Sequence, residues 1–453
     1  MGLDPLRDVR IREAMRAHDL DALICRLPEN VLLLTGYWPL SGFAFVFYPR
    51  EGPVSLVAVT TEMASVPDGV VDDVRSFDWG VLGADDPYVS VRRHLTEVIR
   101  AARLQRARIG YEGSFEAVAP GHMAGETMAP AGVTHAMIAC AAPDARLVDA
   151  TPALYRARAR KTKTKTEIAK LRRANDVAAL GLEAFRAYYE PGRAEAEVAA
   201  HVEAAILSQG IGYHGARHAR AWTQLMTGPE SARAHTPHPA TSSRVIQRGD
   251  LGLLELGTVV DGYWSDLTRT LVAGASPTTR QQELYAAIMA AHAAAMSTAR
   301  PGMTGADVDA VVRAEVERRG FGALFMHHTG HGLGFRYHEP HPLLHPDSGD
   351  IIEEGMVCSI EAGLYIEGFG GLRLEENVVF TETGVSLLSV CPTALTPAAD
   401  VPAPRASGSD GRHIRGVMVD ICGRRQHERS AGRSPHPGLL ADDDGAVGDA
   451  ASR

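Results

Sequence analysis

The sequence has few cysteines, few aromatic residues and no long apolar run. Its five cysteines are scattered and form no C-x-x-C pair, so neither a disulfide framework nor a zinc ribbon is expected. Because no stretch of about 18 apolar residues occurs, no membrane span is expected either. The N-terminal segment is charged throughout and lacks the apolar core of a secretory signal, so the sequence predicts a cytoplasmic protein.

Positive charge is not in excess. Lys and Arg number 46 against 55 Asp and Glu, which gives a formal net charge of −9. We therefore expect no nucleic-acid partner and no membrane partner. With 45% hydrophobic and 22% charged residues among 453, the chain has the composition of an ordinary globular protein and the length of two or three domains.

Three segments follow one another along the chain. In residues 1–157, short apolar runs alternate with helical patterns, which predicts a small α/β domain with helices covering a sheet. A basic stretch at 156–165 is interpreted as a solvated linker or helix start, and residues 158–395 alternate helices with strands that carry the candidate site. Residues 396–453 contain no Phe, Trp or Tyr; they are predicted to be a disordered tail, because they cannot bury enough apolar area to offset their ordering entropy.

The first candidate site segment is a hairpin pattern with two carboxylates. Glu255 stands inside the apolar run LGLLEL, and Asp261-Gly262 is a two-residue hairpin signal. With that turn, Glu255 pairs with Thr268, and Asp266 lies on the same face as a diagonal neighbour, with Cα atoms about 7–8 Å apart. A buried carboxylate is costly unless it is paired or bound to metal, so the hairpin suggests a shared cation. The alternative is one structural salt bridge and one exposed turn acid.

A histidine-rich segment follows at 326–341, where five histidines stand among glycines within sixteen residues. Glycine lets the backbone approach a ligand closely, and imidazole is the commonest metal-binding side chain. This density of histidines indicates a site in which some rings bind metal and others contact substrate. The five are His327, His328, His331, His338 and His341.

The third segment, 355–380, consists of two strands around a glycine-rich turn. Each strand carries an acid inside an apolar alternation, Glu361 in the first and Glu375 in the second. Arg373 shares a face with Glu375, whereas Glu376 points the other way; a structural contact between Arg373 and Glu375 is the alternative. The acids of the three segments and one histidine form an oxygen-rich donor set, which favours a paired site for Mn²⁺, Co²⁺, Zn²⁺ or Fe²⁺. Two such ions can activate a bridging water.

These segments together resemble the pita-bread metallopeptidases, the family of aminopeptidase P, prolidase, methionine aminopeptidase and creatinase. The matching phrases are GDLGLLELGTVVDGYWSDLTRT, HHTGHGLG, GMVCSIEAGLY and GLRLEENVVF, and the N-terminal segment resembles the first domain of the two-domain branch. The resemblance covers about residues 5–395. It implies an α/β (α+β) fold in which a pita-bread, creatinase/aminopeptidase-like catalytic domain (158–395) follows a smaller creatinase-type N-terminal α/β domain (1–157).

The resemblance also implies a cofactor of two divalent metal ions, with Mn²⁺ the first expectation and Co²⁺, Zn²⁺ or Fe²⁺ as alternatives. The implied ligands are Glu255, Asp266, His331, Glu361 and Glu375. The family has Asp where this chain has Glu255; the carboxylate of Glu lies about 1–1.5 Å further out, which bears on metal spacing and occupancy. Ala362 replaces the proline of the family, a change that affects a turn rather than a ligand.

The same match assigns catalytic roles. Glu361 would act as ligand and proton shuttle, taking a proton from the activated water and passing it to the leaving nitrogen. Arg373 would position Glu375 or the shuttle through charge-assisted hydrogen bonds. The implied catalytic set is Glu361, His238, His327, His338 and Arg373, in which His238 (with His235 as its nearby competitor) holds the substrate, and His327 and His338 bind the scissile carbonyl and the proline end.

The function implied is hydrolysis of Xaa-Pro peptide bonds by water that a dinuclear metal site activates. The substrate would be a short proline-containing peptide, the enzyme an aminopeptidase or a dipeptidase, and the assembly a homodimer. Two alternatives stay open. One is a creatinase-like hydrolase that cuts a C–N bond in a small metabolite, suggested by Glu255 and Ala362. The other is a catalytically inactive protein that keeps the pita-bread fold for binding.

Overall fold

The computed structural model describes residues 3–80, 86–113, 131–236 and 240–396. The described residues all belong to one compact unit, residues 1–400. Residues 401–453 lie outside the described residues, as does nearly all of the tail predicted at 396–453. Within the described ranges, no helix is both long and apolar enough to cross a membrane.

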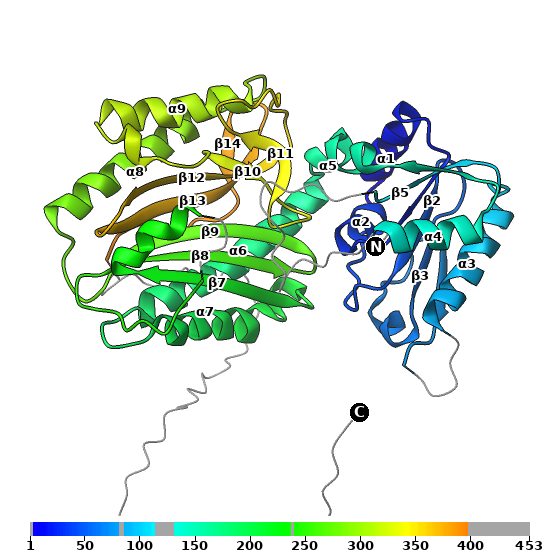
Figure 1. The fold of residues 1–453 in the computed structure, drawn as a ribbon, viewed down its shortest axis with the longest axis horizontal. Coiled ribbons are helices and arrows are strands. Elements are labelled where there is room, and N and C mark those ends of the chain that lie inside the picture. Colours follow the sequence, from blue (N-terminus) through cyan, green and yellow to red (C-terminus); the bar gives the residue numbers. More distant parts are fainter. Residues whose placement is uncertain (1–2, 81–85, 114–130, 237–239, 397–453) are drawn as a thin grey trace, which may run out of the picture. The chain divides into compact units, whose positions relative to one another are not determined.

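The first sheet has six strands in the order β4-β3-β2-β1-β5-β6 (Figure 1). It is mixed, because β1 pairs antiparallel with β2 but parallel with β5. The strands are β1 Ala22–Cys25, β2 Phe45–Pro49, β3 Ser55–Val59, β4 Asp73–Phe77, β5 Arg108–Tyr111 and β6 Arg146–Asp149.

Alternate side chains of this sheet enter two apolar clusters, one on each face. On β1, Leu23 and Cys25 belong to one cluster, and Ala22 and Ile24 belong to the other. The first cluster is covered by α1 Pro5–Ala17 and α2 Pro28–Thr35, the second by α3 Pro87–Ala101 and α4 Ala131–Ala141. The prediction of a small α/β domain with helices over a sheet is confirmed.

The basic stretch at 156–165 begins a helix and is solvated only in part, because Arg156, Arg158 and Lys165 are exposed. It contains α5 Arg158–Lys161 and leads into α6 Lys165–Tyr188, whose first turn is capped by Thr164. Arg160 and Lys163 are buried, because a Glu339 oxygen lies 3.6 Å from Arg160 Nη2 and another lies 3.2 Å from Lys163 Nζ. The interpretation as a helix start is confirmed. The expected solvation is wrong for Arg160 and Lys163, because a carboxylate distant in sequence neutralises these two charges.

Two antiparallel sheets form the following part of the chain. One contains β7, β8 and β9; the other has the order β11-β10-β12-β13-β14. Their bounds are β7 Ala219–Thr227, β8 Leu251–Val260, β9 Tyr263–Val272, β10 Gly330–Gly332, β11 Glu339–Leu344, β12 Val357–Ile366, β13 Gly370–Phe380 and β14 Val385–Leu387. Short helical turns connect the elements at η1 Thr60–Ser65, η2 Pro152–Arg156, η3 Tyr213–Gly215, η4 Gly228–His235 and η5 Gly322–Leu324.

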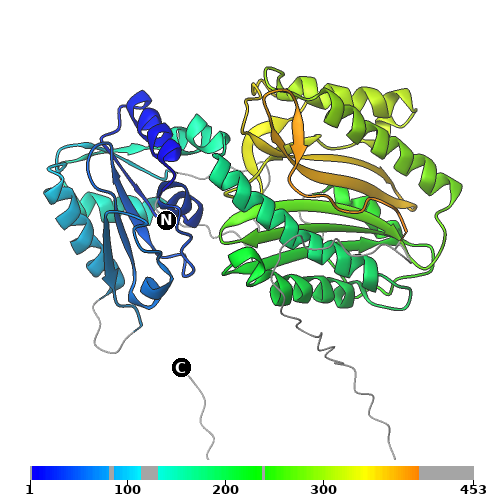
Figure 2. The same ribbon diagram turned by 180° about the vertical axis from the view of Figure 1, so that it is seen from behind.

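Helices cover one face of each of these sheets. α6 and α7 Glu195–Gly210 share an apolar cluster with β8 and β9, and Figure 2 shows α6 running across this sheet. α8 Thr279–Thr298 and α9 Gly305–Arg318 share another cluster with β12 and β13 (Figure 1). Because strand side chains alternate, the uncovered faces carry the candidate site residues.

The first of the two central hairpins, β8–β9, has the predicted register. The β8–β9 turn at Asp261-Gly262 has φ values of 48° and 87°, as a type I′ turn requires. Glu255 pairs with Thr268, which confirms the predicted pairing. On the other sheet, β12 and β13 place Glu361 directly opposite Glu375.

Candidate metal centre

Four of the five predicted ligands meet between the two sheets. The ligand atoms of His331, Glu361 and Glu375 all lie within 4.8 Å of one another, and so do those of Asp266, His331 and His338. His331 Nε2 is 3.4 Å from Asp266 Oδ2 and 3.8 Å from Glu361 Oε1. The hairpins position Asp266, Glu361 and Glu375, whereas His331 lies on the short strand β10, which pairs with β12.

His331 is oriented for metal binding. Its Nδ1 lies 2.9 Å from the carbonyl oxygen of Gly332, so Nδ1 carries the proton and donates it. Nε2 then presents its lone pair to the carboxylates of Asp266 and Glu361. A hydrogen bond from the non-ligating nitrogen is the usual way in which a protein fixes the tautomer of a ligating histidine.

The carboxylates require a cation. Burial, and then the neighbouring acids, raise the pKa of both Asp266 and Glu375 well above the ordinary values. Thr268 donates to Glu375 Oε2 at 2.7 Å, whereas Glu375 Oε1 is buried without a hydrogen-bond partner. An orphaned buried carboxylate oxygen is costly, and a divalent ion among these oxygens and one imidazole would satisfy it. The residues therefore fit a divalent metal.

The fifth predicted ligand, Glu255, has other contacts. It forms an ion pair with Arg373, and the Tyr337 hydroxyl donates to its Oε1 at 2.8 Å. The same hydroxyl lies 3.0 Å from Asp266 Oδ1. Glu255 belongs to neither group of potential ligands among the described residues.

Arg373 and His327 lie beside the cluster, whereas His338 is close enough to Asp266 and His331 to be a further ligand. Arg373 Nη1 is 3.9 Å from Glu361 Oε2, and its Nε donates to Thr268 at 3.1 Å, so Arg373 contacts Glu255 and the shuttle candidate rather than Glu375. His327 Nδ1 is 3.9 Å from Glu361 Oε2, and His338 Nε2 is 3.8 Å from Asp266 Oδ2.

The other predicted histidines are distributed differently. His238 lies outside the described residues, whereas its competitor His235 packs its ring 5.5 Å from that of Tyr365, a neighbour of His327. His328 Nε2 is 3.6 Å from Glu361 Oε1, and burial, with help from His331, lowers the pKa of His328 to about 3. His341 is bound to Asp350 at 2.7 Å and takes no part in the cluster.

Sequence reasoning missed three residues of this site. Tyr337 and Tyr365 carry no metal-ligand signature, and each is placed there by a contact distant in the chain. Gln224 is the β7 cross-strand neighbour of Glu255, is 5% exposed, and has no hydrogen-bond partner at either amide atom. The sequence of β7 is mixed and gave no signal for Gln224; the structure gives one, because a buried amide without a partner suggests a ligand group.

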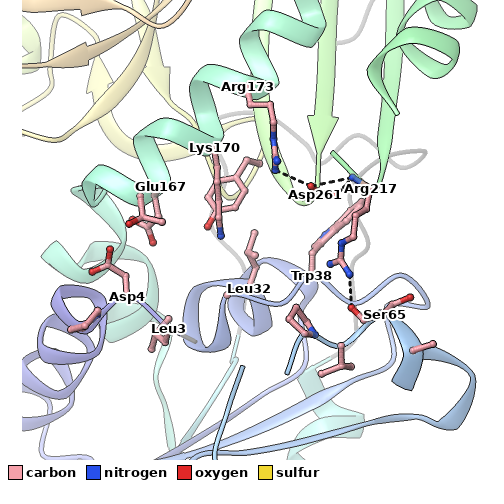
Figure 3. Close-up of a pocket in the computed structure, with 17 residues that line it drawn as sticks. Leu3, Asp4, Leu32, Trp38, Ser65, Glu167, Lys170, Arg173, Arg217 and Asp261 are labelled. Atoms are coloured by element: carbon pink, nitrogen blue, oxygen red, sulfur yellow. Dashed lines mark hydrogen bonds and ion pairs between the residues drawn. The ribbon is translucent and has the colours of Figure 1, made fainter. Parts of the chain in front are cut away.

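A separate cavity of about 720 Å³ lies where the β8–β9 turn meets α6 and the N-terminal residues (Figure 3). Its guanidinium groups already have partners. Arg173 pairs with Asp261 at 2.8 Å, and Arg217 Nη1 donates to the carbonyl oxygen of Ser65 at 2.6 Å. No residue of the two metal-ligand groups lines this cavity, so it is distinct from the candidate centre.

Comparisons with known proteins identify the family of the chain. The model of Metallopeptidase family M24 matches residues 169–382, and that of the Creatinase/Prolidase N-terminal domain matches residues 7–160. An Xaa-Pro dipeptidase of Pyrococcus furiosus is 37% identical over 227 residues, which are 50% of this chain and 62% of the relative. The chain thus aligns with less than two thirds of the length of that dipeptidase.

Two further relatives extend the match. The uncharacterized peptidase YqhT of Bacillus subtilis is 34% identical over 265 residues, which cover 58% of this chain and 71% of that protein. The solved prolidase from Pyrococcus horikoshii has a TM-score of 0.68 at 26% identity, and the match covers 86% of this chain and 99% of the prolidase chain.

Proposed function

Because the chain belongs to metallopeptidase family M24 and has its pita-bread fold, we propose that it hydrolyses Xaa-Pro bonds in short peptides. The observation that carries the proposal is the buried grouping of His331 with Asp266, Glu361 and Glu375. The similarity to an Xaa-Pro dipeptidase and to a solved prolidase supports the substrate class.

The finer parts of the proposal rest on the family resemblance. They are a divalent metal centre with Mn²⁺ as the first expectation, action as an aminopeptidase or a dipeptidase, a homodimer, and a cytoplasmic location. Domain bounds of 1–157 and 158–395 belong to the same proposal.

Glu361 has the position of a proton shuttle. A bound divalent ion would supply Lewis acidity, lowering the pKa of water and polarising the substrate carbonyl. One Glu361 oxygen faces His331, and the other faces His327 and Arg373. Without metal, burial raises the pKa of Glu361 although Arg373 opposes the shift. The position of its second oxygen, away from His331, suits a carboxylate that takes a proton from water and passes it to the leaving nitrogen.

His327 is held as a single neutral tautomer. Its Nδ1 donates to the His328 carbonyl oxygen at 2.7 Å, so Nε2 accepts from the Tyr365 hydroxyl at 2.9 Å. Burial, and then Arg373, lower the pKa of His327 well below its ordinary value. To bind the scissile carbonyl through an N–H, His327 would have to exchange its tautomer and release Tyr365, which makes Tyr365 part of the same substrate-binding unit.

The test is hydrolysis of a panel of short Xaa-Pro peptides by the purified chain, in Mn²⁺ or Co²⁺ and in chelator. Metal-dependent release of the residue before proline is the expected result. No release in any metal would reject the proposal and favour the C–N hydrolase or the inactive binding protein.

Two histidine variants make the test specific. His331→Ala is expected to abolish metal binding and hydrolysis together, because it removes the only imidazole common to both ligand groups. His341→Ala is the matched control, since His341 contacts Asp350 instead of the cluster and should leave metal binding intact.

A further inference from the structure

The carboxylate of Glu255 is occupied at both oxygens. Oε1 accepts from the Tyr337 hydroxyl at 2.8 Å, and Oε2 is ion-paired with Arg373. Tyr337 is 1% exposed and Arg373 is 4% exposed, so both contacts are shielded from water. In such surroundings a charge-assisted hydrogen bond is strong, and a metal ion would have to displace it.

The Tyr337 hydroxyl lies between two carboxylates. It is 2.8 Å from Glu255 Oε1 and 3.0 Å from Asp266 Oδ1, which is the place that a cation shared by these two acids would take. A phenol hydroxyl is neutral, but it relieves the repulsion by donating its proton. Arg373 supplies the positive charge from the other side of Glu255.

The chain makes room for Tyr337 at this point. Gly257 follows Glu255 by two residues on the same face of β8 and pairs with Asp266. A Cβ atom on Gly257 would lie 2.9 Å from Tyr337 Cε2, closer than carbon atoms normally approach. The Tyr337 ring also packs 4.3 Å from the His338 ring and 5.7 Å from that of Trp264. Tyr337 is therefore seated by several neighbours rather than by one hydrogen bond.

The remaining donors suit one ion. Asp266 and Glu361 both face His331 Nε2, and Glu375 Oε1 is the buried oxygen without a partner. The ligand atoms of His331, Glu361 and Glu375 all lie within 4.8 Å of one another, and Asp266 approaches the same His331 nitrogen, so one divalent ion at His331 is the centre that these donors share. A second ion on the Glu255 side would need oxygens that Tyr337 and Arg373 already hold.

We propose that this chain binds one divalent ion tightly, on Asp266, His331, Glu361 and Glu375, and that Tyr337 and Arg373 take the place of a second ion at Glu255. This departs from the paired site implied by the family resemblance. It shares with the proposed function only the presence of a divalent ion and does not depend on the substrate.

The experiment measures metal stoichiometry in the full chain. The protein is loaded with Mn²⁺, freed of unbound metal, and analysed by elemental analysis, calorimetric titration and electron paramagnetic resonance. We expect one tightly bound ion per chain, with the hyperfine pattern of isolated Mn²⁺. The affinity of the parent chain for a second Mn²⁺ ion should be at least about tenfold lower than that of a variant in which Glu255 and Tyr337 are both changed. Two ions of similar affinity and an exchange-coupled spectrum would overturn the proposal.

The double variant Glu255→Asp with Tyr337→Phe shortens the carboxylate and removes the hydroxyl. We expect it to bind a second ion. The matched control is Glu376→Asp, which shortens a buried glutamate that is paired with Arg269 on the opposite face of β13 and should leave one ion. A double variant that folds, as circular dichroism would show, yet still binds one ion would overturn the role given to Glu255 and Tyr337.

Failure of the proposed peptidase function can be distinguished from failure of the single-ion proposal. One tightly bound ion without hydrolysis of any Xaa-Pro peptide would reject the peptidase while supporting the single-ion centre. No bound ion at all would overturn both.

Discussion

Glu339 offers a sharp test of how the buried charges are balanced. Its carboxylate is 1% exposed and lies 3.2 Å from Lys163 Nζ and 3.6 Å from Arg160 Nη2, and it also accepts from the backbone N–H of Phe335 at 2.8 Å. The substitution Glu339→Gln keeps the shape and the backbone acceptor but removes the negative charge. Two buried cations then lose their shared counter-charge.

The expected cost is large. Breaking a buried pair by removing one partner typically destabilises a protein by about 3–5 kcal/mol, because the remaining charge is left in a low-dielectric site. Urea denaturation followed by tryptophan fluorescence measures this loss. Glu190→Gln is the control: its pair with Arg193 is largely exposed and should contribute no more than about 1 kcal/mol.

The pH dependence has a defined sign. Burial raises the pKa of Glu339, but Lys163 and Arg160 outweigh burial and hold that pKa below its ordinary value. Its stabilisation is therefore present above the unfolded pKa of about 4.3 and is lost as pH falls through the folded pKa. The stabilities of the parent chain and the Gln variant should converge in acid. A loss below about 1 kcal/mol at neutral pH, or a difference that does not shrink in acid, would refute this reasoning.

Three further predictions concern the candidate centre. Removing metal with a chelator should lower thermal stability, and Mn²⁺ should restore it by about 2.7 kcal/mol at one hundred times its dissociation constant, as measured by calorimetry; unchanged melting would contradict the cation requirement of the buried acids. Gly257→Ala should destabilise the chain by about 1–3 kcal/mol, because the added Cβ would meet Tyr337. Gly349→Ala is the control, since a Cβ added there has no neighbour within 4 Å. Equal denaturation midpoints for the two variants would count against the packing described. Gln224→Leu should raise the KM for peptide by up to about tenfold with little change in kcat, as steady-state kinetics would reveal, because it removes hydrogen bonds to bound substrate only; a KM equal to that of the parent would exclude a binding role for Gln224.

Local sequence patterns were sufficient to predict much of the candidate site. The turn residues Asp261-Gly262 determine the β8–β9 register, so the pairing of Glu255 with Thr268 could be predicted without a structure. The alternation in β13 similarly placed Arg373 and Glu375 on one face, whereas the pairing of Glu361 with Glu375 came from the structure. The histidine spacing pointed to His331, although it could not separate His328 from His327.

Contacts between segments distant in the chain were beyond such reasoning. In the sequence, Arg160 and Lys163 look like solvated charges. Only the position of Glu339, on the distant strand β11, shows why they are buried. In the sequence, Glu255 looks like a metal ligand that is one methylene longer than the Asp of the family. Only the positions of Tyr337 and Arg373 show what its oxygens bind.

The difference between what the sequence predicts and what it does not has a physical cause. Strand register, turn type and side-chain alternation depend on neighbouring residues, so the sequence by itself determined the hairpins, the α/β domains and the set of acids that face inward. Which partner a buried charge finds depends on elements that meet only after the sheets pack. Tertiary structure therefore decided that His331 gathers three carboxylates while Glu255 turns to a tyrosine and an arginine.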